Sequence, residues 1–300
     1  MITVMTPTYN RAYILEKAYL SLKKQTCFDF EWIIIDDGSS DHTEQMAKKW
    51  IAECQDFSIT YFKQPNGGKH RAINRGVKMA QYDWFLILDS DDMLTESAVA
   101  KVHKWITEVS NLEGFAGIAG LKGHGRSVVG GQPLERYIDA TNLERQKYGL
   151  LGDKAEVYKT EILKKYPFPE FEGENFIRES AVWDRIAKDG LKLRWYNEII
   201  YLCEYIEDGL TRNTNAETYS KNFNGFTYCS RLFLETHSGI LALHKCGEFY
   251  DVAKRRNLGV QEIAKMLRVS QTYLQIGICV FALKKVVKGI VRKCKAAAGR

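Results

Sequence analysis

The sequence of 300 residues predicts an α/β fold, with a mixed, mostly parallel sheet flanked by helices and a helical C-terminal appendage. Three observations predict it. Apolar stretches of strand type alternate with stretches of helical periodicity through the first hundred residues. Polar loops follow four of these strands, and from residue 217 onward only three to four helices are expected. Alternating strands and helices favour parallel strands joined by right-handed crossovers.

The elements of the first hundred residues can be placed in order. The expected strands are residues 2–5, 31–36, 58–62 and 84–88, and the helices between them end near Gln25, Cys54 and Ala80. We expect the first strand to break at Thr6-Pro7. Asp41 with Glu44 three residues later predicts a capping box that opens the second helix.

Four polar loops lie at the carboxyl ends of the predicted strands, where ligands bind in parallel sheets. They are residues 6–10, 36–37, 66–69 and 89–92. The last loop carries three carboxylates, Asp89, Asp91 and Asp92, directly after a buried strand. A divalent cation such as Mg²⁺ or Mn²⁺ would offset this charge, because it prefers oxygen ligands. The alternative is a solvated loop in which Asp91 or Asp92 caps a helix that starts near Thr95.

Charge and cysteine content narrow the class of protein. The net charge is +6, but seven Lys and Arg residues follow Leu283 without an acidic residue, and subtracting them leaves −1 for the rest. The seven cysteines are scattered and form no C-x-x-C pair, which argues against a disulfide framework or a zinc ribbon. The first ten residues do not resemble an export signal, so we expect a cytoplasmic protein.

Four motifs in order resemble the nucleotide-diphospho-sugar glycosyltransferases of family 2, which have the GT-A fold. They are TPTYNR, IIIDDGSSD, an N-x-G-x-x-x-A-x-N-x-G spacing that begins at Asn66, and LILDSDD. The resemblance covers roughly residues 1–100. It implies an inverting transfer of a sugar from a nucleotide diphosphate, with a UDP-sugar expected, to an acceptor hydroxyl in cell-surface polysaccharide or glycolipid assembly.

The resemblance also implies roles for individual residues, with Mn²⁺ or Mg²⁺ as the cofactor. Asp91 and Asp89 would hold the metal. The donor, a nucleotide-sugar, would be bound by Thr6, Pro7, Tyr9, Asp37, Lys69, Asn74, Asp89 and Ser90. Within this set, Asp37 would bond the base and Tyr9 would flank it. The acceptor would be a saccharide or a lipid-linked saccharide, and no nucleic acid is expected.

The resemblance places the general base at Glu179, six residues before Arg185. Members of the family usually carry an acidic pair there, but Arg178 occupies the first position of the pair. A carboxylate beside the reacting carbon can accept the proton of the attacking hydroxyl. The alternative is that Glu179 caps or pairs on a helix. We expect Glu174, Asp184 and Asp189 to be surface charges and Trp183 and Trp195 to lie in the core.

Two departures from the family pattern affect the donor site and the product. Many relatives have a histidine after the acidic pair that reaches the metal, and this sequence has none there, so Thr211 with Arg212 could contact the diphosphate instead. Processive membrane synthases carry Q-x-x-R-W, where this sequence has LKLRW with Leu191 in place of Gln. A processive membrane synthase is therefore not expected.

Two other classes of protein share features with this sequence. Residues 260–274 resemble a helix-turn-helix unit, with apolar side chains at the expected positions, although Arg268 replaces the glycine common in its turn. A nucleotide-sugar nucleotidyltransferase would share the layered sheet and the metal-binding aspartates. It usually begins with a glycine-rich basic loop, which TPTYNRAY does not provide.

The predicted organisation is a GT-A domain over residues 1–215 and a helical region over 216–300. Residues 1–110 would bind the nucleotide-sugar and residues 111–215 the acceptor, with a mobile glycine-rich loop at residues 120–133. The last helix carries an apolar stripe opposite Lys and Arg residues. This helix would either pack on the domain or lie on an anionic membrane surface, which would place the protein on the inner face of the cell membrane.

Overall fold

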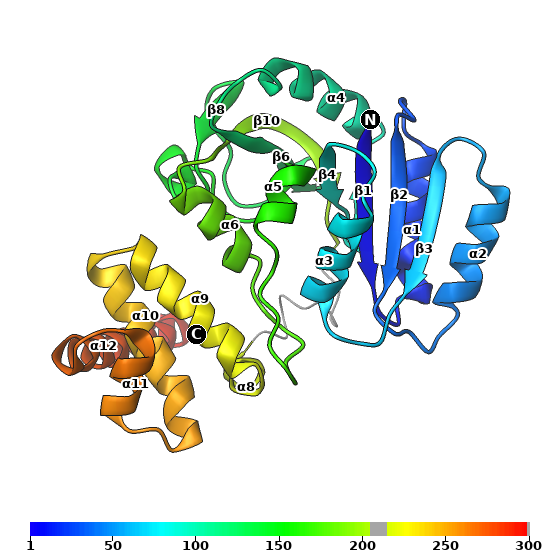
Figure 1. Cartoon of the computed structure of the whole chain (residues 1–300). Helices are drawn as coiled ribbons and strands as arrows, with labels where there is room; N and C mark the ends of the chain where they lie inside the picture. Colours follow the sequence, from blue (N-terminus) through cyan, green and yellow to red (C-terminus); the bar gives the residue numbers. More distant parts are fainter. Residues whose placement is uncertain (205–214, 299–300) are drawn as a thin grey trace. The chain divides into compact units, whose positions relative to one another are not determined.

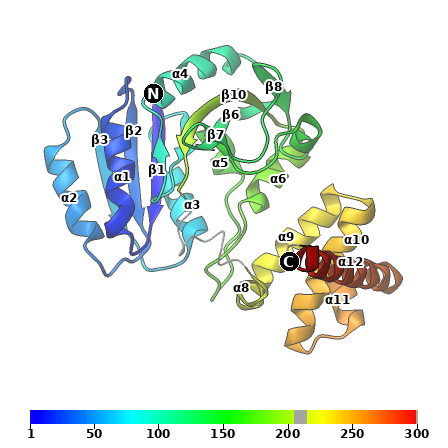
Figure 2. The same ribbon diagram turned by 180° about the vertical axis from the view of Figure 1, so that it is seen from behind.

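The computed structural model describes residues 1–204 and 215–298, with side chains of the last helix as far as Val287. The chain divides into two compact units (Figures 1 and 2). Of the described residues, 1–170 and 182–204 form the first unit, and 171–181 and 215–298 form the second. The segment 171–181 thus groups with the C-terminal helices, although the sequence analysis placed it in the acceptor half.

The described part of the first unit contains a ten-stranded mixed sheet in the order β3-β2-β1-β4-β9-β6-β10-β5, with β7 beside β6 and β8 beside β10. The strands are β1 (Ile2–Thr8), β2 (Phe30–Asp36), β3 (Ser58–Lys63), β4 (Trp84–Ile87), β5 (Met93–Leu94), β6 (Phe115–His124), β7 (Ser127–Val128), β8 (Tyr137–Ala140), β9 (Lys154–Lys159) and β10 (Lys192–Leu202). The first four strands are parallel, as the alternation of strands and helices predicted. Strand β9 is antiparallel to both β4 and β6.

Strand β1 does not break at Thr6-Pro7, so that prediction was wrong. Its pairing with β2 continues to Thr8 opposite Asp36. Pairing with β4 ends at Met5, so Pro7 lies where β1 has a strand partner on one side only. A proline without an N–H group is tolerated at such a position. The strand therefore carries the TPT segment up to the edge where the loops gather.

Helices α1 (Ala12–Lys23), α2 (Thr43–Glu53) and α4 (Ala98–Val109) share a core with alternate residues of the strands, including Val4, Trp32 and Leu86. Helices α3 (Lys69–Met79) and α5 (Thr160–Lys165) contact each other, and α3 lies on the face of the sheet opposite α1 (Figures 1 and 2). Successive side chains of a strand point to opposite faces, which lets one sheet carry both helix layers.

The predicted capping box of α2 does not form. The helix follows His42, whose side chain makes no capping hydrogen bond with any described residue. Asp41 instead accepts hydrogen bonds from the N–H and hydroxyl of Thr43 and from the N–H of Ala12. Its carboxylate thus joins the start of α1 to the start of α2, while Glu44 pairs with Lys48 on the surface.

Residues 120–133 are not simply a loop, because β6 runs to His124 and turns into β7. The glycines of this segment reflect close packing. A Cβ atom at Gly120 would lie 2.6 Å from Cγ1 of Ile200 on the neighbouring strand β10. The glycines that suggested a mobile loop therefore allow the neighbouring strands to pack closely. Asp91 and Asp92 do not cap a helix either, since β5 follows them and α4 begins after Ser97.

The described part of the second unit is helical and contains more helices than the three to four expected. They are α8 (Ala216–Lys221), α9 (Phe223–Thr236), α10 (Gly239–Ala253), α11 (Val260–Leu267) and α12 (Gln271–Ala298). Helix α6 (Ser180–Lys188) crosses the boundary between the units. The core of the second unit includes Phe226, Phe249, Ile263 and Leu274.

Among the described residues, no single helix is long and apolar enough to cross a membrane. Helix α11 with residues 271–287 of α12 passes the length and composition test as a pair bent by 100°.

Candidate active site

The loops that follow β1 and β2 are joined by hydrogen bonds at one edge of the sheet. The N–H of Asp37 donates to the carbonyl of Thr8 at 2.8 Å. The Asn10 side chain accepts from the N–H of Ser40 at 2.8 Å, and the N–H of Asn10 donates to Ser39 Oγ at 2.8 Å. Asn10 adopts a left-handed conformation with φ of 53°, which asparagine tolerates better than most residues. The predicted convergence of these two loops is thus present.

Asp37 joins a third loop to this edge. Its side chain is 4% exposed and accepts from the N–H of Gly68 at 2.6 Å, the N–H of Gly67 at 3.0 Å and Gln64 Nε2 at 2.8 Å. Its carbonyl accepts from Asn66 Nδ2 at 2.9 Å. The carboxylate therefore holds the turn that leads into α3. Contact between Asp37 and a nucleotide base stays a prediction.

The fourth loop brings three carboxylates together after β4. Lys69, the first residue of α3, places its Nζ 2.6 Å from Oδ1 of Asp89. Burial alone would raise the pKa of Asp89, but Lys69 and Lys122 nearby lower it overall. Burial and the charge of Asp89 raise the pKa of Asp91, and the same causes raise that of Asp92 to about 7. The site therefore holds negative charge that is only partly offset.

Tyr201 and Lys122, which the sequence did not single out, lie next to this cluster. The N–H of Asp89 donates to the hydroxyl of Tyr201 on β10 at 2.9 Å. Lys122 on β6 lies with its Nζ 4.2 Å from the centroid of the Tyr201 ring. Burial and the charges of Asp89 and Asp92 raise the pKa of Tyr201 well above its usual value, so it stays a neutral hydroxyl. A lysine inside an otherwise apolar, glycine-rich strand was the available sequence signal for Lys122.

The remaining predicted donor contacts fall into two groups. Tyr9 is 48% exposed at the end of β1 and can reach a ligand. Thr6 is fully buried, and its Oγ1 accepts from Nε1 of Trp32 at 2.9 Å, so its side chain belongs to the core. Pro7 and Ser90 are also buried. These three residues can line a site only through their backbone or the edges of their side chains.

The side chain of Asn74 also makes hydrogen bonds within the first unit. Its amide donates to the carbonyl of Phe168 at 2.9 Å and to Glu170 at 2.8 Å, and its carbonyl oxygen accepts from the N–H of Phe168 at 2.9 Å. The side chain thus fixes the segment around residue 168 on α3. Its predicted contact with the nucleotide-sugar stays a prediction.

Two buried polar atoms near these loops have no hydrogen-bond partner within the described part of the chain. They are Oγ1 of Thr8, at the end of β1, and Nδ1 of His70, in the first turn of α3. Burial lowers the pKa of His70 to about 4, so its ring is neutral. Unsatisfied buried polar atoms are uncommon and need an explanation. Both lie next to loops of the site, although neither was singled out by its motif.

The predicted base, Glu179, belongs to the second unit, exposed and directly before α6. The aspartates belong to the first, so no single unit contains both groups. Arg185 donates from Nη1 to the carbonyl of Pro167 at 2.9 Å. Thr211 and Arg212 lie outside the described residues.

The expectation of surface positions was wrong for Glu174 and Asp184, which are buried, and is confirmed for Asp189, which is exposed. Glu174 is 7% exposed and accepts from the N–H groups of Asn224 and Gly225, at the start of α9. Asp184 accepts from Asn142 at 3.0 Å, and Asp189 accepts from the hydroxyl of Tyr166. Each carboxylate meets a donor that the sequence does not reveal, because the donor lies far away along the chain. Trp183 and Trp195 lie in the core as expected.

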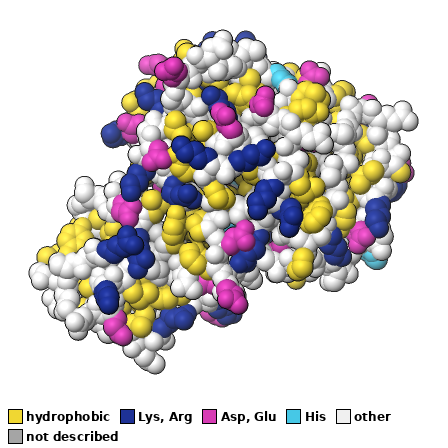
Figure 3. Space-filling view, in the orientation of Figure 1, with side chains coloured by type: hydrophobic (Ala, Val, Ile, Leu, Met, Phe, Trp, Pro, Cys, Tyr) yellow, Lys and Arg dark blue, Asp and Glu magenta, His cyan; other side chains and the backbone are white. Residues whose placement is uncertain are grey.

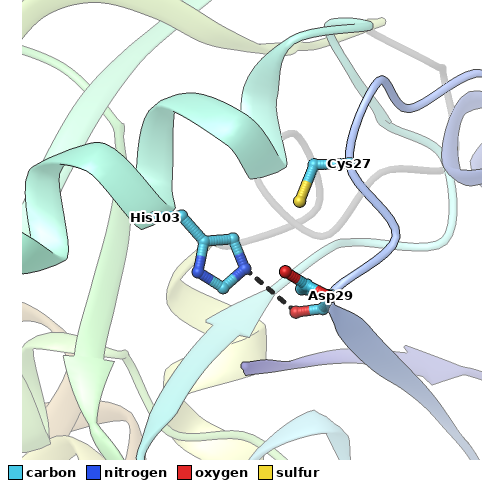
Figure 4. Close-up of side chains that lie close together, drawn as sticks. All are labelled: Cys27, Asp29 and His103. Atoms are coloured by element: carbon cyan, nitrogen blue, oxygen red, sulfur yellow. Dashed lines mark hydrogen bonds between the residues drawn. The ribbon is translucent and has the colours of Figure 1, made fainter.

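The donor set at the carboxylate cluster fits a divalent metal. Asp89 and Asp91 offer hard oxygen ligands, and the raised pKa of Asp91 indicates that a positive charge would be favourable there. A different cluster, Cys27, Asp29 and His103, brings three possible ligand atoms within 4.8 Å of one another (Figure 4). However, Nε2 of His103 bonds the backbone carbonyl of Asp29 at 3.0 Å. This cluster also precedes β2, at the end of the strand opposite Asp37, so it is separate from the site.

Comparison with known proteins identifies the first third of the chain. Residues 3–112 match the model of glycosyl transferase family 2. A glycosyltransferase of Mycoplasma genitalium is 36% identical over 108 residues, 35% of this chain and 36% of the relative. A GalNAc(5)-diNAcBac-PP-undecaprenol beta-1,3-glucosyltransferase of Campylobacter jejuni is 29% identical over 199 residues, 63% of this chain and 60% of the relative. The chain thus spans less than two thirds of the length of these curated relatives.

Solved structures extend the likeness of the fold beyond residue 112. Staphylococcus aureus TarS in complex with UDP-GlcNAc matches with a TM-score of 0.61 and 20% identity, over 85% of this chain and 72% of that one. The mannosyltransferase PcManGT of Pyrobaculum calidifontis, in complex with GDP-Man and Mn²⁺, matches with a TM-score of 0.56 and 16% identity, over 100% of this chain and 80% of that one. Residues 3–112 thus match glycosyltransferase family 2, and the chain has the GT-A fold.

Proposed function

We propose that the protein transfers a sugar from a nucleotide diphosphate to a hydroxyl acceptor with inversion at the reacting carbon. The observation that carries this proposal is the cluster of Asp89, Asp91 and Asp92 beside Lys69, at the edge where the loops after β1, β2 and β3 also gather. Carboxylates with a raised pKa and an adjacent cation suit a ligand that combines phosphate with a metal.

The donor we propose is a UDP-sugar. TarS was solved with UDP-GlcNAc and PcManGT with GDP-Man and Mn²⁺, which supports a nucleotide-diphospho-sugar in this fold. The exposed ring of Tyr9 would flank the base, beside the turn that Asp37 holds. Lys69 would meet the diphosphate from the N-terminus of α3, where helix N–H groups also favour negative charge.

The metal we propose is Mn²⁺ or Mg²⁺, held by Asp91 and Asp89. When bound, such an ion stabilises the negative charge that develops on the leaving diphosphate. Asp89 would keep its contact with Lys69, which orients the carboxylate. Tyr201 would fix the backbone of Asp89 through its hydroxyl. The aspartates themselves accept no proton from the acceptor in this scheme.

Glu179 would be the general base. Its carboxylate would take the proton of the acceptor hydroxyl while that oxygen forms a bond to the sugar carbon, and the bond from that carbon to the diphosphate breaks on the opposite face. Glu179 is exposed and lies directly before α6. Glu174 is a poor substitute, because two N–H groups of α9 occupy it.

The acceptor we propose is a saccharide, carried on a lipid or free, in the assembly of cell-surface polysaccharide or glycolipid. The Campylobacter relative is named for an acceptor linked to undecaprenol diphosphate, which supports a lipid-linked acceptor. The protein would work in the cytoplasm, at the inner face of the membrane. Neither a nucleotidyltransferase nor a DNA-binding role is favoured by a specific feature of the described residues.

A panel of nucleotide-sugars with and without Mn²⁺ tests this proposal. We expect a UDP-sugar to bind and to be hydrolysed or transferred only with the metal. In the same assay, Glu179→Gln should keep donor binding and lose transfer by about a hundredfold, since the amide cannot accept the proton. Glu161→Gln, an exposed change on α5, is the matched control. Transfer by Glu179→Gln within a few-fold of wild type would move the base to Glu172.

A further inference from the structure

Helix α12 uses only part of its circumference to pack within the second unit. Leu274 is fully buried. Gly277 and Phe281 contact α10 so closely that a Cβ atom at Gly247 would lie 2.2 Å from the Cβ of Phe281. One turn later Lys285 pairs with Asp251 of α10 at 2.9 Å. These contacts recur every three to four residues and define one face of the helix.

The opposite face of α12 is apolar and exposed. We call it the outer stripe, and it consists of Ile276, Cys279, Leu283, Val286 and Val287. Leu283 is 66% exposed, Val286 58%, Val287 51% and Ile276 47%. This is the apolar side that the sequence predicted for the last helix, and nothing in the part of the chain that the structure describes covers it. Exposed apolar side chains that occur singly need no explanation, whereas a contiguous stripe marks an interaction surface.

The charge of the C-terminal segment indicates what would cover the outer stripe. From Ile263 to the C-terminus the sequence has nine Lys and Arg residues and no Asp or Glu. Lys284 lies exposed beside Leu283. Basic and apolar side chains lie side by side at the surface of the second unit (Figure 3). A second copy of the same face would bring cations against cations, so the pattern favours a partner that is apolar and anionic at once.

We propose that the outer stripe of α12 docks on an anionic lipid surface. Its side chains would enter the boundary between headgroups and acyl chains, while Lys284 and the other Lys and Arg residues of the C-terminal segment supply the charge that attracts lipid phosphates. The helix would lie in the plane of the surface, since a side that packs on α10 cannot face acyl chains. The inference deepens the proposed function by naming the surface that carries a lipid-linked acceptor. Vesicle binding needs no sugar transfer, so the two proposals fail separately.

Co-sedimentation of the full chain with vesicles tests the docking surface. The wild type should bind vesicles of phosphatidylglycerol mixed with phosphatidylcholine, bind pure phosphatidylcholine poorly, and dissociate in high salt. Leu283→Asp should weaken binding about tenfold, because an apolar anchor is replaced by a charge of the wrong sign. Leu134→Asp is the matched control, because Leu134 is 100% exposed in the first unit. It should bind like the wild type.

Two results would overturn the proposal. One is equal binding of the wild type and Leu283→Asp to anionic vesicles. The other is that Leu283→Asp changes the oligomeric state, measured by light scattering, but does not change vesicle binding. The outer stripe would then be a contact between copies of the chain. Circular dichroism of both variants checks the fold, which an exposed substitution should leave intact. Lys284→Glu adds a second reading and should weaken binding to anionic vesicles only.

Discussion

The acidic turns after β2 and β4 lie on either side of β1 and have similar sequences, yet their carboxylates have different surroundings. Asp36 accepts from the N–H of Ser39 at 2.7 Å and from the hydroxyl of Tyr61 at 2.6 Å. Asp37 accepts from two glycine N–H groups and an amide. In contrast, burial raises the pKa of both Asp91 and Asp92. In the second turn Asp89 pairs with Lys69 and Asp92 accepts from the N–H of Glu204 at 3.2 Å, yet the pKa values of Asp91 and Asp92 stay raised.

The two turns therefore differ in role: the turn after β2 supports the structure, and the turn after β4 is suited to binding a ligand. Several N–H groups that donate to one carboxylate stabilise its ionised form, and the same hydrogen bonds fix the surrounding loops. Carboxylates crowded together without enough donors favour a ligand that brings positive charge. The motif alone does not distinguish the two turns, since both read as aspartates after an apolar strand. Each of the following variants tests this contrast, in order of expected effect.

Asp91→Asn should have the largest effect, on turnover. Removing the carboxylate should reduce metal-dependent transfer by about a thousandfold, or about 4 kcal/mol of transition-state stabilisation. The fold should persist, because the pKa of Asp91 is raised and the metal-free site loses an unfavourable charge. Transfer rates across a Mn²⁺ titration measure the effect, and thermal unfolding is the control. A wild-type rate at saturating Mn²⁺ would remove Asp91 from the metal site.

Asp37→Ala should act mainly on stability. It leaves the buried N–H groups of Gly67 and Gly68 without an acceptor, which costs about 3 kcal/mol in the free energy of unfolding. Donor affinity should fall as well, because the turn into α3 loses its anchor. Asp56→Ala removes a surface ion pair with Lys23 and should change stability by less than about 0.5 kcal/mol. Chemical denaturation measures both; equal stabilities would show that Asp37 does not hold the turn.

The comparison of the two turns also shows which parts of the fold and of the site could be predicted from the sequence. Periodicity placed the four parallel strands and the convergence of their loops, because these depend on local pattern and on the handedness of crossovers. It could not place Tyr201 or Lys122 beneath Asp89, because β6 and β10 approach the cluster from far along the chain. Likewise, the N–H group that donates to Glu174 belongs to α9, some fifty residues later in the chain.

Asp92→Asn should stabilise the protein in a pH-dependent way. The folded state holds a proton on Asp92 up to a pKa of about 7, against an ordinary value of 3.8. As the pH rises between these values, the unfolded state loses its proton first, so the carboxyl lowers the free energy of unfolding. In metal-free buffer the variant should equal the wild type near pH 4 and exceed it by a few kcal/mol in the free energy of unfolding at pH 8. A difference independent of pH would contradict this account.

The smallest effects should come from a matched pair of tyrosines, Tyr61→Phe and Tyr201→Phe. Each removes one hydroxyl that contacts an aspartate turn, Tyr61 at Asp36 and Tyr201 at Asp89. Losing one such hydrogen bond should lower stability by about 1 kcal/mol in either variant. Only Tyr201→Phe should also change the reaction, by raising several-fold the Mn²⁺ concentration that gives half-maximal transfer, because the backbone of Asp89 is then less fixed. Unfolding curves and Mn²⁺ titrations on both proteins separate the two effects. If Tyr61→Phe shifted the metal requirement equally, the two turns would work as one site and the contrast between them would fail.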